Sequence, residues 1–556
     1  MTFDKAQDSL LYIRNNEVTM KDYNDRKGRV IASSFVHYGN GDGRHVKMTE
    51  NEKYVFFAQE NSGTESGFDL CIYKNADLDR KKGKMTEKIT VLDSVVRDFG
   101  IHPDGNFVLY LKGNRLYFSN LKEITIVATE VSEFYLSKNN QQMIYHKNDG
   151  SVYTRGTALR SASVLVDTGI TKVLSEKQEY AKIYYLKGTN LYVKEHGRER
   201  RLIAEMVADA ILLDGSLYFV RREPNTWRFQ EIFVDDKKVY DKELTEPAPE
   251  DYYAVNLDGK RYFDEVAYRE VLTLYEQKLF RDTIRDYFEK NPITTEQFVL
   301  YQVKGNETKV VDENLAEYTL RYNSSHRTIV YKKNVLQENK IRLSTVAGIE
   351  DALSRGQEFA GEPISVGMGV LNKNEKPYLG LSLFPKGQIE ISLDGKYIYC
   401  LEQQAENRLG TLVRYEFGAK ELKNRKELCK NITDFALDGA DSRVVIVFEG
   451  EKMGIVVGDT HTHLSDSSIH DFFYVDGTLY FFDDYNTGSM SGTLKRFRDG
   501  KVKNVDVNVH AFDVRNLKTV AYIKNYNTEL GVGDMYLKSG NKKREKVDIC
   551  VRSILH

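Results

Sequence analysis

One short apolar phrase returns along the whole chain, and it constrains the fold more than any other feature of the sequence. It reads Val-Arg-Asp-Phe at 96–99, Val-Ser-Glu-Phe at 131–134 and Ile-Thr-Asp-Phe at 432–435. Two further copies, Ile-His-Asp-Phe and Val-His-Ala-Phe, begin at Ile469 and Val509. Each copy is followed by a polar turn, a run rich in Tyr or Phe, and a second short apolar run. The chain is therefore built from a repeat.

The repeat consists of four short strands. In the copy that begins at Val96, the strands are expected at 96–101, 107–111, 115–119 and 124–128. Apolar and polar residues alternate with a period of two, which indicates strands, and the Asp-Gly and Gly-Asn pairs between them are typical of hairpin turns. The repeat returns every 40 residues or so, which is about the spacing of β-propeller blades. The sequence predicts an all-β propeller.

The number of repeats indicates more than one propeller. They are expected to begin near residues 46, 96, 131, 170, 207, 315, 388, 432, 469 and 509. One more repeat, shared between the two ends of the chain, makes about eleven blades, whereas a single ring usually has about four to eight. We therefore expect a tandem propeller of two rings, with N-terminal blades in 1–314 and C-terminal blades in 315–556.

Two intervals between repeats are too long and predict insertions. The first, at about 247–292, is expected to be helical because apolar residues recur every three to five positions from Phe263 to Phe288 and Pro292 follows. The second, at about 347–377, is expected to hold a short helix from Ile349 and then a glycine-rich connection over 361–369.

The two ends of the chain are expected to complete one blade together. Strand-like runs at 10–14, 18–23 and 30–35 have no copy of the apolar phrase before them, and a copy at 551–555 has no strands after it. We expect the last strand to complete the first blade, which removes an open sheet edge.

Charge and cysteine usage exclude several classes of protein. The chain has 80 Lys and Arg against 82 Asp and Glu, a net charge of -2, so we expect no nucleic-acid partner. The basic runs 198–201 and 542–546 are interpreted as hairpin turns or strand ends. The four cysteines are far apart in sequence, which favours free buried thiols.

Nothing in the sequence predicts a membrane span or a signal peptide. As written, the chain is expected to be cytoplasmic. It is expected to be extracellular if it is a fragment of an anchored protein.

The repeats resemble a known family. Ser-Leu-Asp-Gly at 392–395 precedes Tyr-Ile-Tyr at 397–399, and His-Pro-Asp-Gly at 102–105 precedes Leu-Tyr at 109–110. These motifs are similar to the TolB-like, WD40-like propeller repeats of bacterial proteins of unknown function. The Trp-Asp ending of eukaryotic WD40 repeats is missing. The resemblance implies a binding or scaffolding module and specifies no ligand.

Long polar hairpin loops are the main candidate binding site. They are expected at 59–67, 403–410, 483–492 and 525–533, and if the ends of the chain close a ring, several cluster on one face. Loops on a rigid scaffold commonly carry binding residues, although they are also sites of tolerated insertion. The candidate binding residues are Asn61, Glu65, Asp483, Asp484, Tyr485, Asn486, Tyr526 and Asn527.

Two other candidate sites stand apart from these loops. Trp227, the single tryptophan, is expected in a loop, either as a binding anchor or packed on a neighbouring blade or the helical insertion. His461 and His463 point to the same side of a strand and, with Asp459 or Asp466, are candidate zinc ligands. The alternative interpretation of this segment is a polar outer strand followed by a turn.

The sequence favours a non-catalytic binding or scaffold protein that recognises a protein or glycan. It has no Gly-x-Ser-x-Gly motif and no signature of a nucleotide or calcium site, so no catalytic residue and no cofactor is expected. The alternative is a propeller-type enzyme, a lyase or hydrolase, with a metal at the histidine pair. A purely structural spacer is a third hypothesis.

Overall fold

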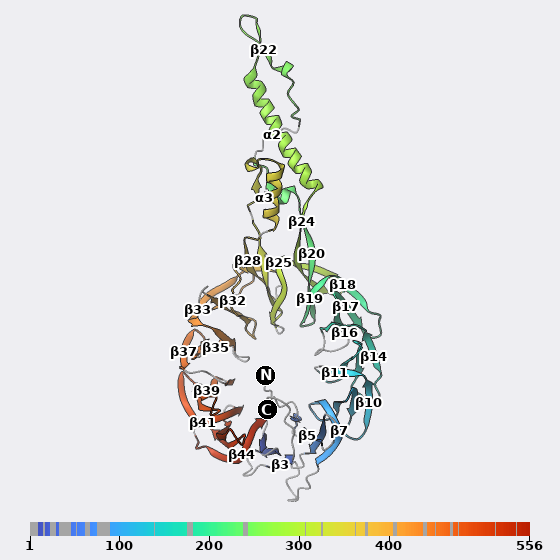
Figure 1. The fold of residues 1–556 in the computed structure, drawn as a ribbon, viewed down its shortest axis with the longest axis vertical. Coiled ribbons are helices and arrows are strands. Elements are labelled where there is room, and N and C mark those ends of the chain that lie inside the picture. The colour runs from blue at the N-terminus through green and yellow to red at the C-terminus, as the bar shows by residue number, and fades with distance from the viewer. Residues whose placement is uncertain are drawn as a thin grey trace. The chain divides into compact units, whose positions relative to one another are not determined.

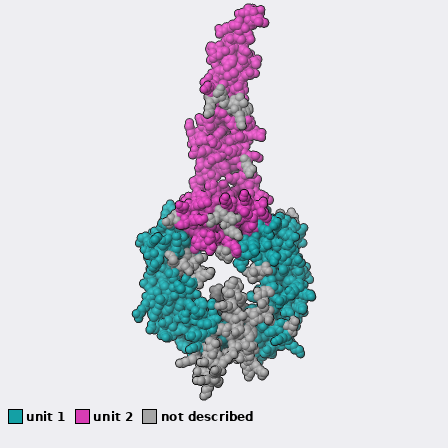
Figure 2. Space-filling view, turned by 180° about the vertical axis from the view of Figure 1, so that it is seen from behind, with its two compact units in different colours: residues 1–205, 385–416, 424–556 teal, residues 206–384, 417–423 magenta. Residues whose placement is uncertain are grey.

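The structure is a computed structural model, and the chain separates into two compact units, coloured in Figure 2. Unit 1 comprises residues 1–205, 385–416 and 424–556, and unit 2 comprises residues 206–384 and 417–423. The residues that the structure describes are 9–14, 17–22, 29–32, 46–51, 53–61, 67–74, 89–137, 139–174, 182–236, 243–305, 307–323, 326–337, 339–361, 363–372, 376–403, 409–437, 442–450, 452–466, 471–475, 477–516, 519–540 and 542–555.

Unit 1 is built from antiparallel strands (Figure 1). In the first part of the chain they are β1 (Ser9–Arg14), β2 (Glu17–Asp22), β3 (Arg29–Ala32), β4 (Val46–Met48), β5 (Tyr54–Glu60), β6 (Phe68–Lys74), β7 (Ile89–Ile101), β8 (Val108–Lys112), β9 (Arg115–Ser119), β10 (Ile124–Thr129), β11 (Val131–Leu136), β12 (Gln142–Lys147), β13 (Val152–Gly156), β14 (Ser163–Asp167), β15 (Lys172–Val173), β16 (Lys182–Lys187), β17 (Asn190–Glu195) and β18 (Arg201–Ala204).

In the last part of the chain the strands are β30 (Ile389–Ile391), β31 (Tyr397–Gln403), β32 (Gly410–Phe417), β33 (Leu422–Ile432), β34 (Asp434–Leu437), β35 (Val444–Glu449), β36 (Lys452–Val457), β37 (Thr460–Ser465), β38 (Phe472–Val475), β39 (Thr478–Asn486), β40 (Ser491–Arg498), β41 (Lys501–Asn516), β42 (Thr519–Asn527), β43 (Val532–Ser539) and β44 (Glu545–Leu555).

Each blade is a four-stranded meander whose second and third strands carry most of the core. In the blade of β7 to β10, Tyr110 on β8 is fully buried, and its ring stacks on that of Tyr117 with centroids 5.2 Å apart. The turns depend on residues that tolerate positive φ, because Gly105 and Gly113 have φ of 74° and 57°. The Asp-Gly and Gly-Asn turns of the sequence are therefore the hairpins of the blade.

Several pairs of consecutive blades are linked by a long strand that belongs to both blades. The described strands form sheets of ten, seven, four, four, seven, four and four strands, besides two two-stranded sheets. Because β41 and β44 are shared within the ten-stranded sheet, and β7 and β25 (Glu307–Asn323) within the seven-stranded ones, the described residues contain eleven four-stranded blades. The all-β propeller fold with about eleven blades is confirmed.

A residue in the left-handed conformation stands immediately before the apolar phrase in many blades. It lets the chain leave the outer strand of one blade and begin the inner strand of the next, as a β-bulge does. The residues concerned are Val95, Glu130, Met206, Asn314, Asn431, Asn508 and Cys550, with φ between 55° and 62°. The recurring phrase therefore marks the first strand of each blade.

The two ends of unit 1 pair with each other. β44 lies antiparallel to β1, with Tyr12 opposite Ile554 and Arg14 opposite Val551. Tyr12 also donates its hydroxyl to Asp548 at 2.8 Å. One blade of unit 1 is thus made of β44, β1, β2 and β3.

Unit 2 contains two more blades and all the helices of the described residues. Its elements are β19 (Val207–Leu213), β20 (Ser216–Trp227), α1 (Phe229–Ile232), β21 (Phe233–Val234), η2 (Pro249–Tyr252), β22 (Tyr253–Val255), β23 (Arg261–Phe263), α2 (Glu265–Lys290), β24 (Ile293–Lys304), β25, β26 (Thr328–Val335), β27 (Ile341–Arg342), η3 (Leu343–Thr345), α3 (Ile349–Gly361), β28 (Ser365–Leu371) and β29 (Tyr378–Leu381).

The first insertion is helical in its second half only. Asp264 caps α2 by accepting a hydrogen bond from the amide of Ala267 at 3.1 Å. The last turns of α2 bury Ile284 and Phe288 in an apolar cluster with α3, whereas the side chains of its earlier turns are exposed or half-buried. The part of 247–292 that precedes α2 is instead a 3-10 turn and the hairpin of β22 and β23.

The second expected insertion is shorter than predicted. Its helix is α3, but the glycine-rich stretch expected to connect back is strand β28, which pairs with β26 and β29. Glycine is required there because a Cβ on Gly369 would lie 2.2 Å from the ring of Tyr331. The expected boundary between residues 314 and 315 falls inside β25, and the assignment of blades to two rings stays a prediction.

No helix among the described residues combines the length and the apolar character needed to cross a membrane.

Candidate functional site

Two of the predicted long hairpins lie side by side in unit 1, and His510 joins them. Its Nδ1 lies 2.8 Å from the carbonyl oxygen of Met490, in the turn between β39 and β40. Its ring stacks on that of Tyr526, in the hairpin of β42 and β43, with centroids 3.5 Å apart and planes 10° apart. We call the surface formed by Tyr485, Met490, His510, Tyr526 and Leu530 the loop face.

The two hairpins have the same local structure. Asp484 and Asn525 both have φ of 54°, and the ladder shifts register at the same place in each hairpin. Asn486 and Asn527 follow two residues later and close the turns, because their side-chain oxygens accept bonds from the amides of Ser489 and of Glu529 and Leu530. Their side-chain oxygens are therefore committed to turn structure.

The aromatic residues of the loop face are half-buried. Tyr485 packs against Phe482 with ring centroids 5.1 Å apart. Burial raises the pKa of Tyr485, and charge interactions with Tyr526 and Asp471 raise it further. The phenol group of Tyr485 is thus a neutral hydrogen-bonding group at physiological pH.

Exposed apolar side chains stand at the tips of both turns. Met490 is 40% exposed and Leu530 is 67% exposed. A thioether and an isobutyl group beside two tyrosines and a histidine are the side-chain types that favour a protein partner.

The other predicted binding residues have different roles. Asp483 is buried and accepts bonds from Ser465 and Lys495, so it holds neighbouring strands rather than facing outward. Asn61 follows the end of β5, and Glu65 lies outside the described residues.

Trp227 lies at the end of a strand, not in a loop. It is the last residue of β20, opposite Ile293 on β24, and its indole N–H donates to the hydroxyl of Thr295 at 3.0 Å. Its ring packs edge-on against Phe359 of α3, with centroids 5.9 Å apart. Trp227 therefore anchors the second insertion to the sheet, the packing alternative of the sequence analysis.

The candidate zinc ligands His461 and His463 lie on β37, opposite Val456 and Gly454. The nearest carboxylate to His461 Nε2 is that of Glu449 at 3.9 Å, and His463 Nε2 lies 3.1 Å from Asp466. Each imidazole is therefore beside a different carboxylate.

Asp459, the third candidate ligand, accepts a hydrogen bond from Arg414 at 2.7 Å and lies 3.7 Å from Lys426. Two cations already neutralise this carboxylate. Among the described residues, no group of three or more His, Cys, Asp or Glu side chains is arranged to hold a metal ion.

His510 is the residue of the loop face that sequence reasoning missed. It occupies the second position of the apolar phrase Val-His-Ala-Phe, where three other copies have Arg, Ser or Thr and the copy at Ile469 also has His, so it reads as part of the repeat. The sequence signal that could have identified His510 is an aromatic residue at a solvent-facing position of the phrase.

The chain was also compared with known proteins. No protein-family model and no curated protein matches it. Among solved structures it is similar to a eukaryotic initiation factor, at 8% identity over 98% of each chain, with a TM-score of 0.36.

Two further similar structures are enzymes by name. Dipeptidyl peptidase 4 of Porphyromonas gingivalis is 11% identical over 88% of this chain and 65% of that chain, with a TM-score of 0.33. Oligogalacturonate lyase from Vibrio parahaemolyticus is 9% identical over 71% of this chain and 92% of that chain, with a TM-score of 0.25. Structural similarity this distant does not indicate a function for this chain.

Proposed function

We propose that this chain is a non-catalytic binding protein that holds a protein partner on the loop face. The observation that carries the proposal is the position of His510, which joins two hairpins into one surface with exposed Met490 and Leu530. Exposed apolar groups within a rim of Tyr, Asn and Asp match the composition of protein interfaces. The resemblance of the repeats to TolB-like propellers supports a binding role.

The loop face favours a protein over a glycan. Sugar sites rely on several free polar groups, but Asn486 and Asn527 use their side-chain oxygens in their own turns. The exposed side chains of Met490 and Leu530 at the turn tips are apolar and offer a sugar no strong hydrogen-bond partner.

Affinity capture from the source cells tests the proposal. The bait proteins are the wild-type chain, the variant Tyr526→Ala/Leu530→Ser, and the control Ile126→Ser/Val457→Ser. The control removes two apolar side chains of unit 1 that are 54% and 45% exposed and lie outside the loop face.

The proposal requires one partner protein that the wild type and the control retain and the loop-face variant loses. That partner is then purified and titrated against the three proteins, and we expect a loss of affinity of tenfold or more for the loop-face variant. Equal affinity for all three proteins contradicts the proposal. So does stoichiometric zinc that is lost in His461→Ala/His463→Ala together with an enzymatic activity.

A further inference from the structure

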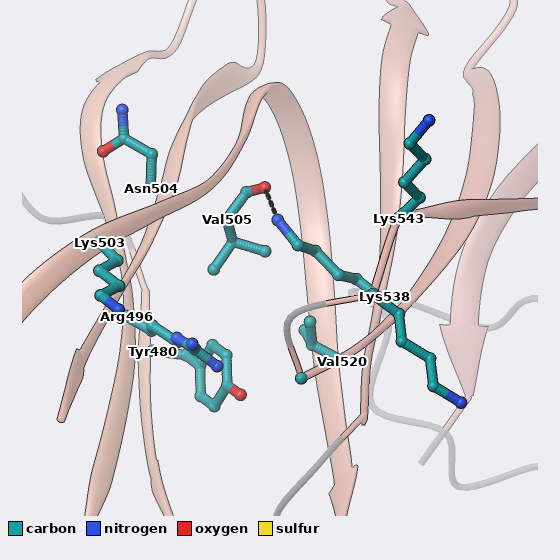
Figure 3. A pocket seen from close by; sticks show the side chains of 10 residues that line it. Tyr480, Arg496, Lys503, Asn504, Val505, Val520, Lys538 and Lys543 are labelled. Carbon is teal, nitrogen blue, oxygen red and sulfur yellow. Dashed lines mark hydrogen bonds between the residues drawn. The ribbon is translucent and has the colours of Figure 1, made fainter.

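A cavity lies at the other end of the strands that carry the loop face. It has a volume of about 270 Å³ and lies between the adjacent blades that share β41. On the first blade, Arg496 pairs with Tyr480 and Lys503 in one row across the sheet. On the second blade, Lys538 lies opposite Val520. Figure 3 shows these side chains around the cavity.

The cationic side chains that line the cavity come from separate segments of the chain. Its lining includes Arg496, Lys503, Lys538, Lys542 and Lys543 and no carboxylate. The chain as a whole has a net charge of -2, so this local excess of positive charge is not a consequence of composition. An anion bound in the cavity would be attracted by all of these positive charges.

Three of these cations are free to bind. Lys503, Lys542 and Lys543 are exposed, and no ion pair joins them to any residue that the structure describes. Lys542 and Lys543 belong to the turn after Gly540, whose φ of 56° shapes that turn.

Lys538 lies deeper in the cavity and is held in place. Its ammonium group donates to the carbonyl oxygen of Val505 at 2.7 Å (Figure 3). Burial lowers the pKa of Lys538, Asp506 opposes this effect, and the positive charges of Arg496 and Arg544 add to it. An anion in the cavity offsets the effects that lower the pKa of Lys538, because it stabilises the charged ammonium group.

The nearest acidic residue on β41 is already neutralised. Asp506 follows Val505, and its carboxylate accepts bonds from Lys524 at 2.6 Å, Tyr522 at 2.7 Å and Arg544. It therefore does not supply the counter-charge that the cavity lacks.

The floor of the cavity is apolar. Tyr480, Val505 and Val520 are all buried there. A small volume with an apolar floor and a cationic rim on two sides fits a compact ligand with several negative charges. A nucleic-acid strand needs a longer basic groove with exposed aromatic platforms.

We propose that this cavity binds the phosphate groups of a small polyphosphorylated molecule. Arg496 and Lys503 hold one phosphate from the first blade. Lys542 and Lys543 hold a second from the turn of the next blade, and Lys538 lies between them.

Isothermal titration calorimetry with inorganic tripolyphosphate tests the proposal at low salt. The variants are Lys503→Gln/Lys543→Gln and the matched control Lys122→Gln/Lys309→Gln, which also removes two exposed lysines. Thermal unfolding followed by circular dichroism checks that all proteins are folded. A labelled single-stranded oligonucleotide, of about 15 nucleotides because that spans a basic groove, is titrated in parallel by fluorescence anisotropy.

We expect tripolyphosphate to bind the wild type and the control alike, and the pocket variant at least tenfold more weakly. The loop-face variant Tyr526→Ala/Leu530→Ser is expected to bind it as the wild type does. Equal binding by the pocket variant and the control, or no binding by the wild type, overturns the proposal. Binding of the oligonucleotide without tripolyphosphate overturns the small-ligand assignment in favour of nucleic acid.

Discussion

Tyr522 donates its phenolic hydroxyl to the buried carboxylate of Asp506 at 2.7 Å, across the junction of two consecutive blades. Lys524, two residues further along β42, donates to the same carboxylate at 2.6 Å. The arrangement recurs at other blade junctions. In each, one carboxylate contacts a tyrosine and the Lys or Arg that lies two residues after it. The recurring sets are Asp93 with Tyr110 and Lys112, Asp167 with Tyr185 and Lys187, Asp312 with Tyr331 and Lys333, and Asp548 with Tyr12 and Arg14.

Replacing Asp506 by Asn is expected to lower the free energy of unfolding by about 3 kcal/mol, because it leaves the buried ammonium of Lys524 without a counter-charge. Urea unfolding followed by circular dichroism measures the change. Asp499→Asn is the control, since the Asp499 side chain is 89% exposed, and its effect is expected within about 0.5 kcal/mol. Equal effects of the two substitutions contradict a structural role for the recurring carboxylate.

The carboxylate of Asp506 also makes the stability of the fold depend on pH. Burial alone raises the pKa of Asp506, but hydrogen bonds from Lys524, Tyr522, the amide of Val507 and Arg544 outweigh it and lower the pKa to about 2. The pKa of Asp in an unfolded chain is ~3.9, so the pKa of Asp506 is lower in the folded protein than in the unfolded one. The stabilisation is therefore present above about pH 4 and is lost as the pH falls toward 2.

The lowered pKa of Asp506 contributes roughly 2 kcal/mol to the free energy of unfolding. We expect the stability difference between wild type and Asp506→Asn to shrink by about that amount between pH 5 and pH 2.5. A difference independent of pH over this window refutes the assignment.

Val95→Asn is expected to stabilise the chain by about 1 kcal/mol, because a β-branched residue is strained at the φ of 60° that Val95 adopts. Asn already occupies the equivalent position at Asn314, Asn431 and Asn508. The melting temperature measures the effect. Val91→Asn, an exposed site on the same strand, is the control and is expected to be neutral or mildly destabilising.

Gly369→Ala is expected to destabilise unit 2 by about 3 kcal/mol, since the new Cβ meets the Tyr331 ring, which Asp312 holds in place. Fluorescence of Trp227, the single tryptophan, reports on this unit. Gly361→Ala is the control, because nothing lies within 4 Å of its added Cβ. Similar unfolding midpoints for the two variants are incompatible with the close approach at Gly369.

His510→Ala is expected to loosen both turns of the loop face, because it removes the contact with Met490 and the stack on Tyr526. Amide hydrogen exchange over 487–490 and 528–531 is expected to quicken about fivefold, the equivalent of about 1 kcal/mol. His463→Ala on β37 is the matched control and should leave both turns unchanged. Unchanged exchange in His510→Ala shows that the two hairpins are held independently.

The candidate sites could be predicted from the sequence only in part. The hairpins that contain Tyr485 and Tyr526 were found because they break the tight-turn pattern of other blades. The sequence does not show which residues of these hairpins face a ligand. Asp483 and Asp484 are adjacent in sequence, yet only Asp483 is buried. Lys542 and Lys543 were interpreted as a hairpin turn, which they are, but their neighbours across the cavity come from β40, β41 and β43.

The sequence by itself determined the blade. The apolar phrase, the Asp-Gly turns and the Tyr-rich strands specify four short strands, because side-chain alternation and turn chemistry are local properties. The orphan copy at 551–555 likewise indicated the strand that pairs with β1. Only the tertiary structure decided which polar groups meet between blades. His510 with Tyr526, Asp506 with Tyr522, and Arg496 with Lys538 come together because the shared strand β41 sets adjacent sheets side by side, and no local pattern encodes that distance.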